Sequence, residues 1–284
     1  MLNKNTLTFL ECDKDFAGAR TVLFGAPFDS TTSFRPGTRF GPHAVRSESF
    51  GLESYSPYLD RDLIDAAVLD TGDVDVSYGD TSATLDAIEE RAEEILAAGK
   101  RPFLIGGEHL VTLGAVRAAV KHYPELHIVH FDAHADLRDD YLGAKLSHAC
   151  VIRRCHELVG DGRIFQFGIR SGDREEFRWG KDHVTTRKFD FEGLAETLKA
   201  LEGKPVYFTV DLDVMDPSVF PGTGTPEPGG VTFDEARRAA TLVCQAANVV
   251  ACDACELSPH YDQTGASTAA AGKLIREMLL SLEV

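Results

Sequence analysis

The feature of this sequence that most constrains its fold is a regular alternation of short β-rich runs with segments of helical periodicity. Several of the short runs are apolar at consecutive positions, which is typical of strands covered on both faces. Strands separated by helices need crossover connections, so we expect one largely parallel sheet with helices on both sides, an α/β fold. The seven predicted strands span residues 21–25, 67–69, 102–105, 127–131, 163–167, 206–210 and 249–252.

Two of the segments between the strands carry clear signals for the ends of helices. Apolar residues over 85–96 recur with the period of a helix, and Gly99 stands where a left-handed residue would end it. Thr232 and Glu235 have the spacing of a capping box ahead of a predicted helix over 236–247.

The chain shows no internal boundary. A last helix is predicted over about 266–282, and no repeat, linker or low-complexity tract interrupts the pattern before it. We therefore predict a single domain over residues 1–284.

Acidic residues outnumber basic ones by 45 to 29, which gives a formal net charge of −16 at pH 7. That charge argues against nucleic acid and anionic membranes as partners, and it favours a small cationic molecule. The first 16 residues contain no apolar run as long as a signal peptide, and nowhere do about 18 apolar residues follow one another. We expect a cytoplasmic protein.

The six cysteines are too scattered for a disulfide framework in a chain of this size, so we expect free thiols. Cys252 and Cys255 have the spacing of a redox or zinc motif. No second pair of this kind accompanies them, and they lie in a strand-like run. We interpret them as small strand side chains.

Dense polar clusters follow four of the predicted strands. Ligands of open α/β sheets bind beyond the carboxyl ends of the strands, so these clusters should meet at one edge of the sheet. The clusters are Gly106-Gly107-Glu108-His109, Asp132-Ala133-His134-Ala135-Asp136, Asp211-Leu212-Asp213 and Glu256.

The acidic clusters have the pattern of a metal site. In an extended segment Asp132, His134 and Asp136 point to one side, where their charges would repel or titrate to neutrality without a cation. Asp211 and Asp213 repeat the arrangement on another strand. Either motif alone could be a solvated loop, but their joint placement after strands favours metal binding.

The complete set of donors suits two divalent ions. His109 follows a double glycine that lets the chain turn sharply, and it completes a group of four carboxylates and two imidazoles. Mixed oxygen and nitrogen donors favour manganese or a similar hard ion. The further negative charge of Glu256 favours a substrate that carries positive charge.

His148 lies just downstream of these ligands, where a mobile imidazole could carry protons. The remaining histidines lack such companions and are interpreted as surface or core residues. They are His43, His122, His127, His130, His156, His183 and His260.

Together these motifs resemble those of the ureohydrolase family of arginases, agmatinases and guanidinobutyrases, over nearly the whole chain. The N-terminal segment RPGTRFGP further resembles a signature of the agmatinase branch. The motifs are RPGTRFGP (35–42), GGEH (106–109), FDAHAD (131–136), SHA (147–149), DLDVMDP (211–217) and ELSP (256–259).

The resemblance implies a three-layer α-β-α fold around a mainly parallel sheet of about eight strands, and two Mn²⁺ ions per subunit. Members of the family usually form homo-oligomers, often trimers or hexamers. The implied ligands of one ion are His109, Asp132, Asp136 and Asp211, and those of the other are Asp132, His134, Asp211 and Asp213.

The implied reaction is hydrolysis of a guanidinium C–N bond, which releases urea and an amine. Glu256 would hold the guanidinium by paired hydrogen bonds. Asp136 would orient the attacking hydroxide while it ligates a metal, and His148 would bind near the substrate and relay a proton to the departing amine.

Agmatine is the favoured substrate, because residues 137–146 lack the Asn, Ser and Thr pattern by which arginases recognise an α-carboxylate. Its products would be putrescine and urea, a step of polyamine biosynthesis. If Arg138 faces the pocket, it could receive the carboxylate of 4-guanidinobutyrate, and an exposed turn is the alternative. Guanidinobutyrase, arginase and formimidoylglutamase activities and an inactive metal-binding relative stay open. Ala135, Ala149 and Cys150 depart from the common family pattern without removing a ligand.

Overall fold

The centre of the molecule is an eight-stranded sheet in which every neighbouring pair of strands is parallel. A computed structural model describes residues 7–283, so the first six residues of the N-terminal segment lie outside the described residues. The strands, in order across the sheet, are β4 (Val68–Asp73), β1 (Thr21–Ala26), β5 (Arg101–Gly106), β10 (Asn248–Cys255), β9 (Pro205–Asp211), β6 (His127–Phe131), β7 (Ile164–Ile169) and β8 (Thr185–Lys188).

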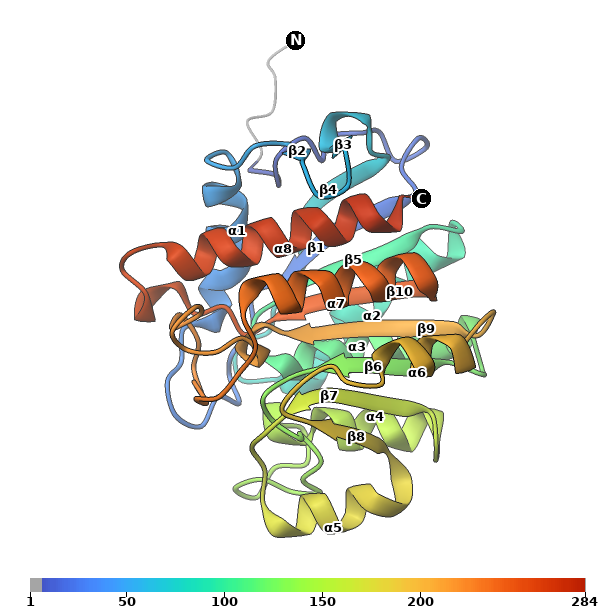
Figure 1. The fold of residues 1–284 in the computed structure, drawn as a ribbon, viewed down its shortest axis with the longest axis vertical. Coiled ribbons are helices and arrows are strands. Elements are labelled where there is room, and N and C mark those ends of the chain that lie inside the picture. Colours follow the sequence, from blue (N-terminus) through green and yellow to red (C-terminus); the bar gives the residue numbers. More distant parts are fainter. Residues whose placement is uncertain (1–6, 284) are drawn as a thin grey trace.

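Helices cover both faces of the sheet, as Figure 1 shows, which confirms the predicted three-layer α/β fold. One layer consists of α2 (Thr81–Ala97), α3 (Thr112–His122) and α4 (Val151–Val159), and the other of α1 (Gly41–Ser49), α8 (Ala266–Leu282), α7 (Phe233–Ala246) and α6 (Leu194–Ala200). Helix α5 (Arg174–His183) packs beside the edge strand β8.

Short elements complete the structure of residues 7–283. Strands β2 (Tyr55–Ser56) and β3 (Arg61–Asp62) form a small antiparallel ribbon. Single 3₁₀ turns lie at Thr38–Phe40, Leu63–Asp65, His109–Val111, His148–Cys150, Leu212–Val214 and Pro259–Tyr261.

The central strands are apolar at consecutive positions because successive side chains enter two different cores. Along β5, Phe103 and Ile105 pack into the core beneath α7 and α8, whereas Leu104 packs into the core beneath α2 and α3. All three side chains are buried. The two-sided burial predicted from the sequence follows directly from this alternation.

All seven predicted strands are present, and the predicted helix ends are confirmed. Gly99 has a φ of 70° just after α2, and Thr232 and Glu235 form a capping box at the start of α7. The sequence did not predict β8, because its residues Thr-Thr-Arg-Lys are polar and largely exposed at the edge of the sheet.

The six cysteines are all buried and free, as expected, and Cys252 and Cys255 both lie in β10. Among residues 7–283 the longest apolar helical stretches fall short of what is needed to cross a membrane.

Candidate metal centre and substrate pocket

The four polar clusters found in the sequence follow the four central strands of the sheet. Strands β5, β10, β9 and β6 are consecutive neighbours, so the residues after them meet at one edge. His109 follows β5, Glu256 follows β10, Asp211 ends β9 and Asp132 follows β6. The parallel topology thus converts four motifs that are far apart in sequence into one site.

Special backbone conformations bring these residues inward. Gly107 passes so close to residue 28 that an added Cβ would lie 2.1 Å from the Phe28 carbonyl oxygen. Asp136 and Glu256 have φ values of 52° and 69°, in the left-handed region that such residues adopt at a cost of about 1–3 kcal/mol. The Glu256 backbone is held there by its N–H, which donates to the Gly107 carbonyl at 2.8 Å.

His109 lies at the centre of the first group of donors. Its Nδ1 is 3.0 Å from an oxygen of Asp136, 3.2 Å from one of Asp132 and 3.5 Å from one of Asp211. All four side chains are buried.

The hydrogen bonds of Thr209 determine the tautomer of the neutral His109 ring. Thr209 donates its hydroxyl proton to Asp253 at 2.6 Å, so the same oxygen accepts from His109 Nε2–H at 2.9 Å. A neutral ring with its proton on Nε2 would present the Nδ1 lone pair to three carboxylates. Although burial opposes a charged ring, hydrogen bonding to Asp132 and Asp136 raises the pKa of His109 well above its usual value, so without a metal ion a proton occupies Nδ1. The neutral arrangement repels unless a cation lies between the groups, so this donor set fits a divalent ion.

His134 forms a second group with Asp132 and Asp213. Its Nδ1 is 3.1 Å from Asp213 and 3.5 Å from Asp132, and these three residues could hold a metal ion together. Asp211 is tied to this group, because its carboxylate accepts the Asp213 backbone N–H at 2.9 Å. The six predicted ligands therefore lie together, with Asp132 between the two histidines.

Burial and mutual repulsion shift the pKa values of these groups in the directions expected of an uncompensated site. Burial, with the charges of Asp213 and Asp132, raises the pKa of Asp211 well above its usual value. Burial and the charge of Asp132 likewise raise the pKa of Asp136 to about 7. Burial also opposes ionisation of Asp132, but hydrogen bonds from His109, His130 and His134 hold its pKa well below the usual range. A cluster of this kind needs positive charge.

Glu256 lies beside the ligands and keeps one oxygen free of them. Its Oε1 accepts the His109 backbone N–H at 2.7 Å, while Oε2 faces Gly224. Burial and the charge of Glu108 raise the pKa of Glu256 well above its usual value, so a cation beside it would be stabilising.

His148 is oriented by the loop that crosses above the site. Its Nδ1–H donates to the Thr31 carbonyl at 3.0 Å, which leaves the lone pair on Nε2, 3.5 Å from the Ser33 hydroxyl. Burial lowers the pKa of His148 to about 4, so the ring is neutral at pH 7. The adjacent Ala149 and Cys150, which depart from the family pattern, do not disturb these contacts.

Glu108 supports that loop and was not assigned a role from the sequence. Its carboxylate accepts the Thr31 backbone N–H at 2.9 Å and the hydroxyls of Thr31 and Thr32. Burial raises the pKa of Glu108 to about 7. Its place beside His109 in the GGEH motif was the one available signal.

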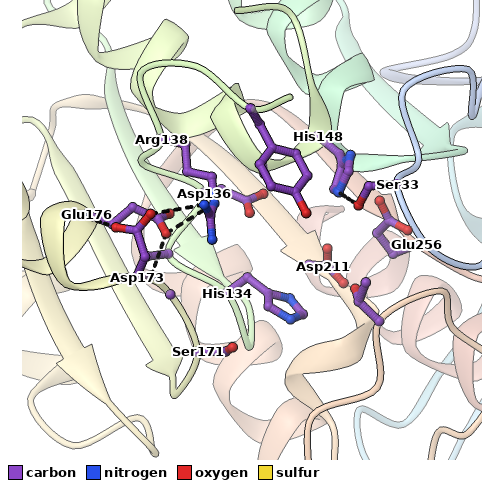
Figure 2. Close-up of a pocket in the computed structure, with 15 residues that line it drawn as sticks. Ser33, His134, Asp136, Arg138, His148, Ser171, Asp173, Glu176, Asp211 and Glu256 are labelled. Atoms are coloured by element: carbon purple, nitrogen blue, oxygen red, sulfur yellow. Dashed lines mark hydrogen bonds and ion pairs between the residues drawn. The ribbon is translucent and has the colours of Figure 1, made fainter. Parts of the chain in front are cut away.

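These residues open onto a cavity of about 240 Å³ (Figure 2). In Figure 2, His134, Asp211, His148 and Glu256 surround one end, and Arg138 with its acidic partners lies at the other. The full lining is Ser33, His134, Ala135, Asp136, Arg138, Tyr141, His148, Ala149, Ser171, Gly172, Asp173, Glu176, Asp211, Thr225 and Glu256.

Arg138 faces the cavity, but two carboxylates already compensate its charge. Its guanidinium is 3.0 Å from Asp173 and 3.4 Å from Glu176, and it lies 4.7 Å from the centre of the Tyr141 ring. With one positive and two negative charges, this far end of the pocket is net negative. The alternative of a simple exposed turn at Arg138 is therefore wrong.

His130 is a core residue, as interpreted from the sequence, but the expectation that it lacks companions in the site is wrong. Its Nε2 is 2.8 Å from Asp132, and the amide nitrogen of Gln166 is 3.0 Å from its Nδ1. The same amide nitrogen is 2.7 Å from the Ala135 carbonyl, so it is a donor, and His130 therefore donates from Nε2 to Asp132. The residue lies on the buried strand β6, where the sequence shows apolar neighbours rather than its partners.

Comparison with known proteins identifies the relatives of this chain. The Arginase family model matches residues 19–281. This chain belongs to the arginase family. The chain is 46% identical over 275 residues to an agmatinase of Bacillus anthracis, covering 96% of this chain and 95% of that one. It is 40% identical to an N(1)-aminopropylagmatine ureohydrolase of Thermococcus kodakarensis, over 84% of this chain and 83% of the other.

A solved structure agrees with these sequence relatives. The agmatine ureohydrolase of Thermoplasma volcanium superposes with a TM-score of 0.89 at 36% identity, covering 98% of this chain and 95% of that one. The predicted resemblance is therefore confirmed, and with it the metal dependence that is general in this family.

Proposed function

We propose that this arginase-family hydrolase converts agmatine and water to putrescine and urea. The observation that carries the proposal is one cavity lined at one end by His134, Asp136 and Asp211, with the other three metal-type donors buried in contact with them, and by a net negative cluster at the other end. The 46% identity to an agmatinase along nearly the whole chain supports this assignment.

We propose two Mn²⁺ ions, held in the ligand sets implied by the resemblance. His109 with Asp132, Asp136 and Asp211 suits one ion, and His134 with Asp132, Asp211 and Asp213 suits the other. When bound, a pair of such ions lowers the pKa of water towards neutrality and so supplies a nucleophile at pH 7.

The chain's own residues position the substrate and move the protons. The free oxygen of Glu256 accepts a guanidinium N–H, and the substrate's charge in turn favours the ionised carboxylate. Asp136 would orient the nucleophile by accepting a hydrogen bond from it while ligating a metal ion. His148 begins neutral, so its Nε2 takes up the proton that the attacking water loses and then gives it to the departing amine.

The far end of the pocket favours a substrate that ends in an ammonium group. A carboxylate such as that of 4-guanidinobutyrate would meet Asp173 and Glu176 together with Arg138, and those two acids already occupy the guanidinium. The ammonium of agmatine meets the same cluster with attraction.

The test measures urea release by the manganese-loaded protein from agmatine, N1-aminopropylagmatine, arginine, 4-guanidinobutyrate and guanidine, and formamide release from formiminoglutamate. We expect the highest kcat/KM for agmatine. Turnover of another guanidine in its place would contradict the substrate but leave the chemistry intact. A protein with two bound ions that releases neither urea nor formamide from any of these compounds would contradict the enzyme assignment.

A matched pair of variants tests the proton path. His148→Gln should lower kcat by roughly 100-fold while the metal content stays unchanged. His122→Gln, on the surface beside Glu93, should behave like the parent protein. Equal kcat values for the two variants would exclude His148 from the reaction.

We also propose that the protein forms a homo-oligomer, a trimer or hexamer, as the family resemblance implies. Light scattering coupled to size-exclusion chromatography measures the molar mass and separates these states from the 31.0 kDa monomer.

A further inference from the structure

Two of the histidines interpreted as isolated, His156 and His183, meet at the surface around a shared carboxylate. His156 Nε2 is 2.7 Å and His183 Nδ1 is 2.6 Å from the same oxygen of Asp161. One histidine lies in α4, the other ends α5, and Asp161 lies in the loop after α4. The three donor atoms all lie within 4.8 Å of one another.

The backbone around this cluster is arranged to keep the three residues together. Gly160 and Gly162, on either side of Asp161, have φ values of 86° and 71°, which turn the loop back over both helix ends. The N–H of Gly160 donates to the His156 carbonyl at 2.8 Å, and that of Gly162 donates to the His183 carbonyl at 3.1 Å. Each ligand residue is therefore tied to its neighbour through the main chain.

The imidazole rings are also held in place. The Trp179 ring stacks on His183 with centroids 4.2 Å apart, and it meets His156 edge-on at 4.7 Å. Arg153 covers the ring of Trp179 with its guanidinium 3.6 Å from the centroid. The histidine side chains are 14% and 30% exposed, whereas that of Asp161 is 66% exposed.

We propose that His156, Asp161 and His183 form a surface metal site that binds one borderline divalent transition ion such as Zn²⁺. Two imidazole nitrogens and one carboxylate oxygen are donors that such ions prefer, and water would fill the remaining position. Donors of a tetrahedral site with bonds of about 2.0 Å lie roughly 3.3 Å apart, so the cluster must open by about 0.6 Å. Rotation of the exposed Asp161 carboxylate supplies that movement.

The site is separate from the catalytic centre but shares its supporting helices. His148 lies just before α4, and Asp173 caps the start of α5, so both helices begin at the substrate pocket. At 1.5 Å per residue, their far ends lie roughly 13 Å from it. A bound ion would join the two helices at the ends that point away from the substrate.

The test uses Trp179, the only tryptophan of the chain, as a local probe. The manganese-loaded protein is titrated with Ni²⁺, a paramagnetic ion that quenches a neighbouring indole. We expect saturable quenching of the Trp179 fluorescence, and its reversal when Zn²⁺ displaces Ni²⁺. Metal analysis after equilibration with Zn²⁺ should find one ion per subunit more than in Asp161→Asn or His156→Ala.

Three variants decide the outcome. Asp161→Asn keeps both histidines and the Trp179 stack while it removes the anionic donor, and His156→Ala removes one imidazole. Each should weaken Ni²⁺ binding at least about 10-fold. His122→Ala, the surface control, should bind Ni²⁺ like the parent. Absence of saturable quenching, or equal Ni²⁺ affinity in Asp161→Asn and the parent, would overturn the proposal, whatever the protein does with agmatine.

Discussion

Two acidic clusters in this protein differ in where their compensating charge comes from. At the edge of the sheet that β4 forms, Arg46 of α1 contacts the Asp70 carboxylate through two nitrogens, with N to O distances of 2.7 and 3.0 Å. The same guanidinium also contacts Asp73. At the carboxyl ends of the central strands, Asp132, Asp136, Asp211 and Asp213 converge, and their nearest partners in the chain are histidines.

The difference teaches how to distinguish a structural acidic cluster from a functional one. Asp70 also accepts the backbone N–H groups of Phe9 at 2.8 Å and Gly72 at 3.0 Å, so its charge is satisfied within the fold. Among residues 7–283 no arginine or lysine pairs with Asp211, and burial with neighbouring acids raises its pKa. The first cluster is complete as folded, whereas the second requires charge from outside the chain.

The largest effect is expected from removing a shared ligand. Asp211→Ala should lower kcat for agmatine by at least about 1,000-fold, because it deprives both proposed ions of a donor. Metal analysis should find fewer than two ions per subunit. An active variant that keeps both ions would mean that Asp211 is no ligand.

Removing the cation of the structural cluster should damage stability instead. Arg46→Met leaves the buried Asp70 carboxylate unpaired, which typically costs about 3–5 kcal/mol of unfolding free energy. Chemical denaturation measures this loss. The metal content of the protein that remains folded should match that of the parent. If Arg46→Met lost metal but not stability, the assignment of this cluster to structure and of the other to metal binding would be contradicted.

Chelation should destabilise the protein through the functional cluster alone. At a free Mn²⁺ concentration 100 times its dissociation constant, each bound ion stabilises the folded state by about 2.7 kcal/mol. Denaturation midpoints with EDTA and with Mn²⁺ measure the difference. The shift of the denaturation midpoint between EDTA and Mn²⁺ should be smaller in Asp211→Ala than in the parent. An equal shift in both proteins would mean that the stabilising ions bind at another site.

The smallest expected effect is on the stability of the metal-free protein, where neutralising one aspartate in each cluster should change the unfolding free energy in opposite directions. Burial raises the pKa of Asp211, so the metal-free folded protein loses stability as pH rises above the usual carboxyl range. Asp211→Asn removes that loss and should stabilise the metal-free protein by an amount of order 1 kcal/mol. Asp70→Asn should destabilise it. Denaturation in EDTA at pH 5 and pH 8 measures both, and the gain from Asp211→Asn should be larger at pH 8.

The sequence predicted the fold well because its main signals are local. Apolar runs, a capping box and a glycine after a helix each depend on residues close together in the chain, and all were confirmed. Strand β8 was missed, because an exposed edge strand needs no apolar residues. Convergence of the four motifs was predictable because parallel strands place their carboxyl ends together.

The parts of the site that escaped prediction depend on contacts between distant residues. Glu108 reaches Thr31 across 77 positions, and Gln166 reaches His130 across 36. The compensation of Arg138 by Asp173 and Glu176 likewise arises only when α5 packs beside the pocket. No pattern of neighbouring residues in the sequence marks such distant partners. Their roles can be assigned only once the structure shows which atoms donate and which accept hydrogen bonds.

The position of β10 has a consequence for synthesis of the protein on the ribosome. This strand is the last of the strands in residues 7–283, yet it lies between β5 and β9 at the middle of the sheet. Until residues 248–255 emerge from the ribosome, the nascent chain holds two half-sheets with no shared strand, and Glu256 has not emerged either. We therefore expect the pocket to form only after residue 256 has left the ribosome, so that chains truncated before Glu256 bind no guanidinium.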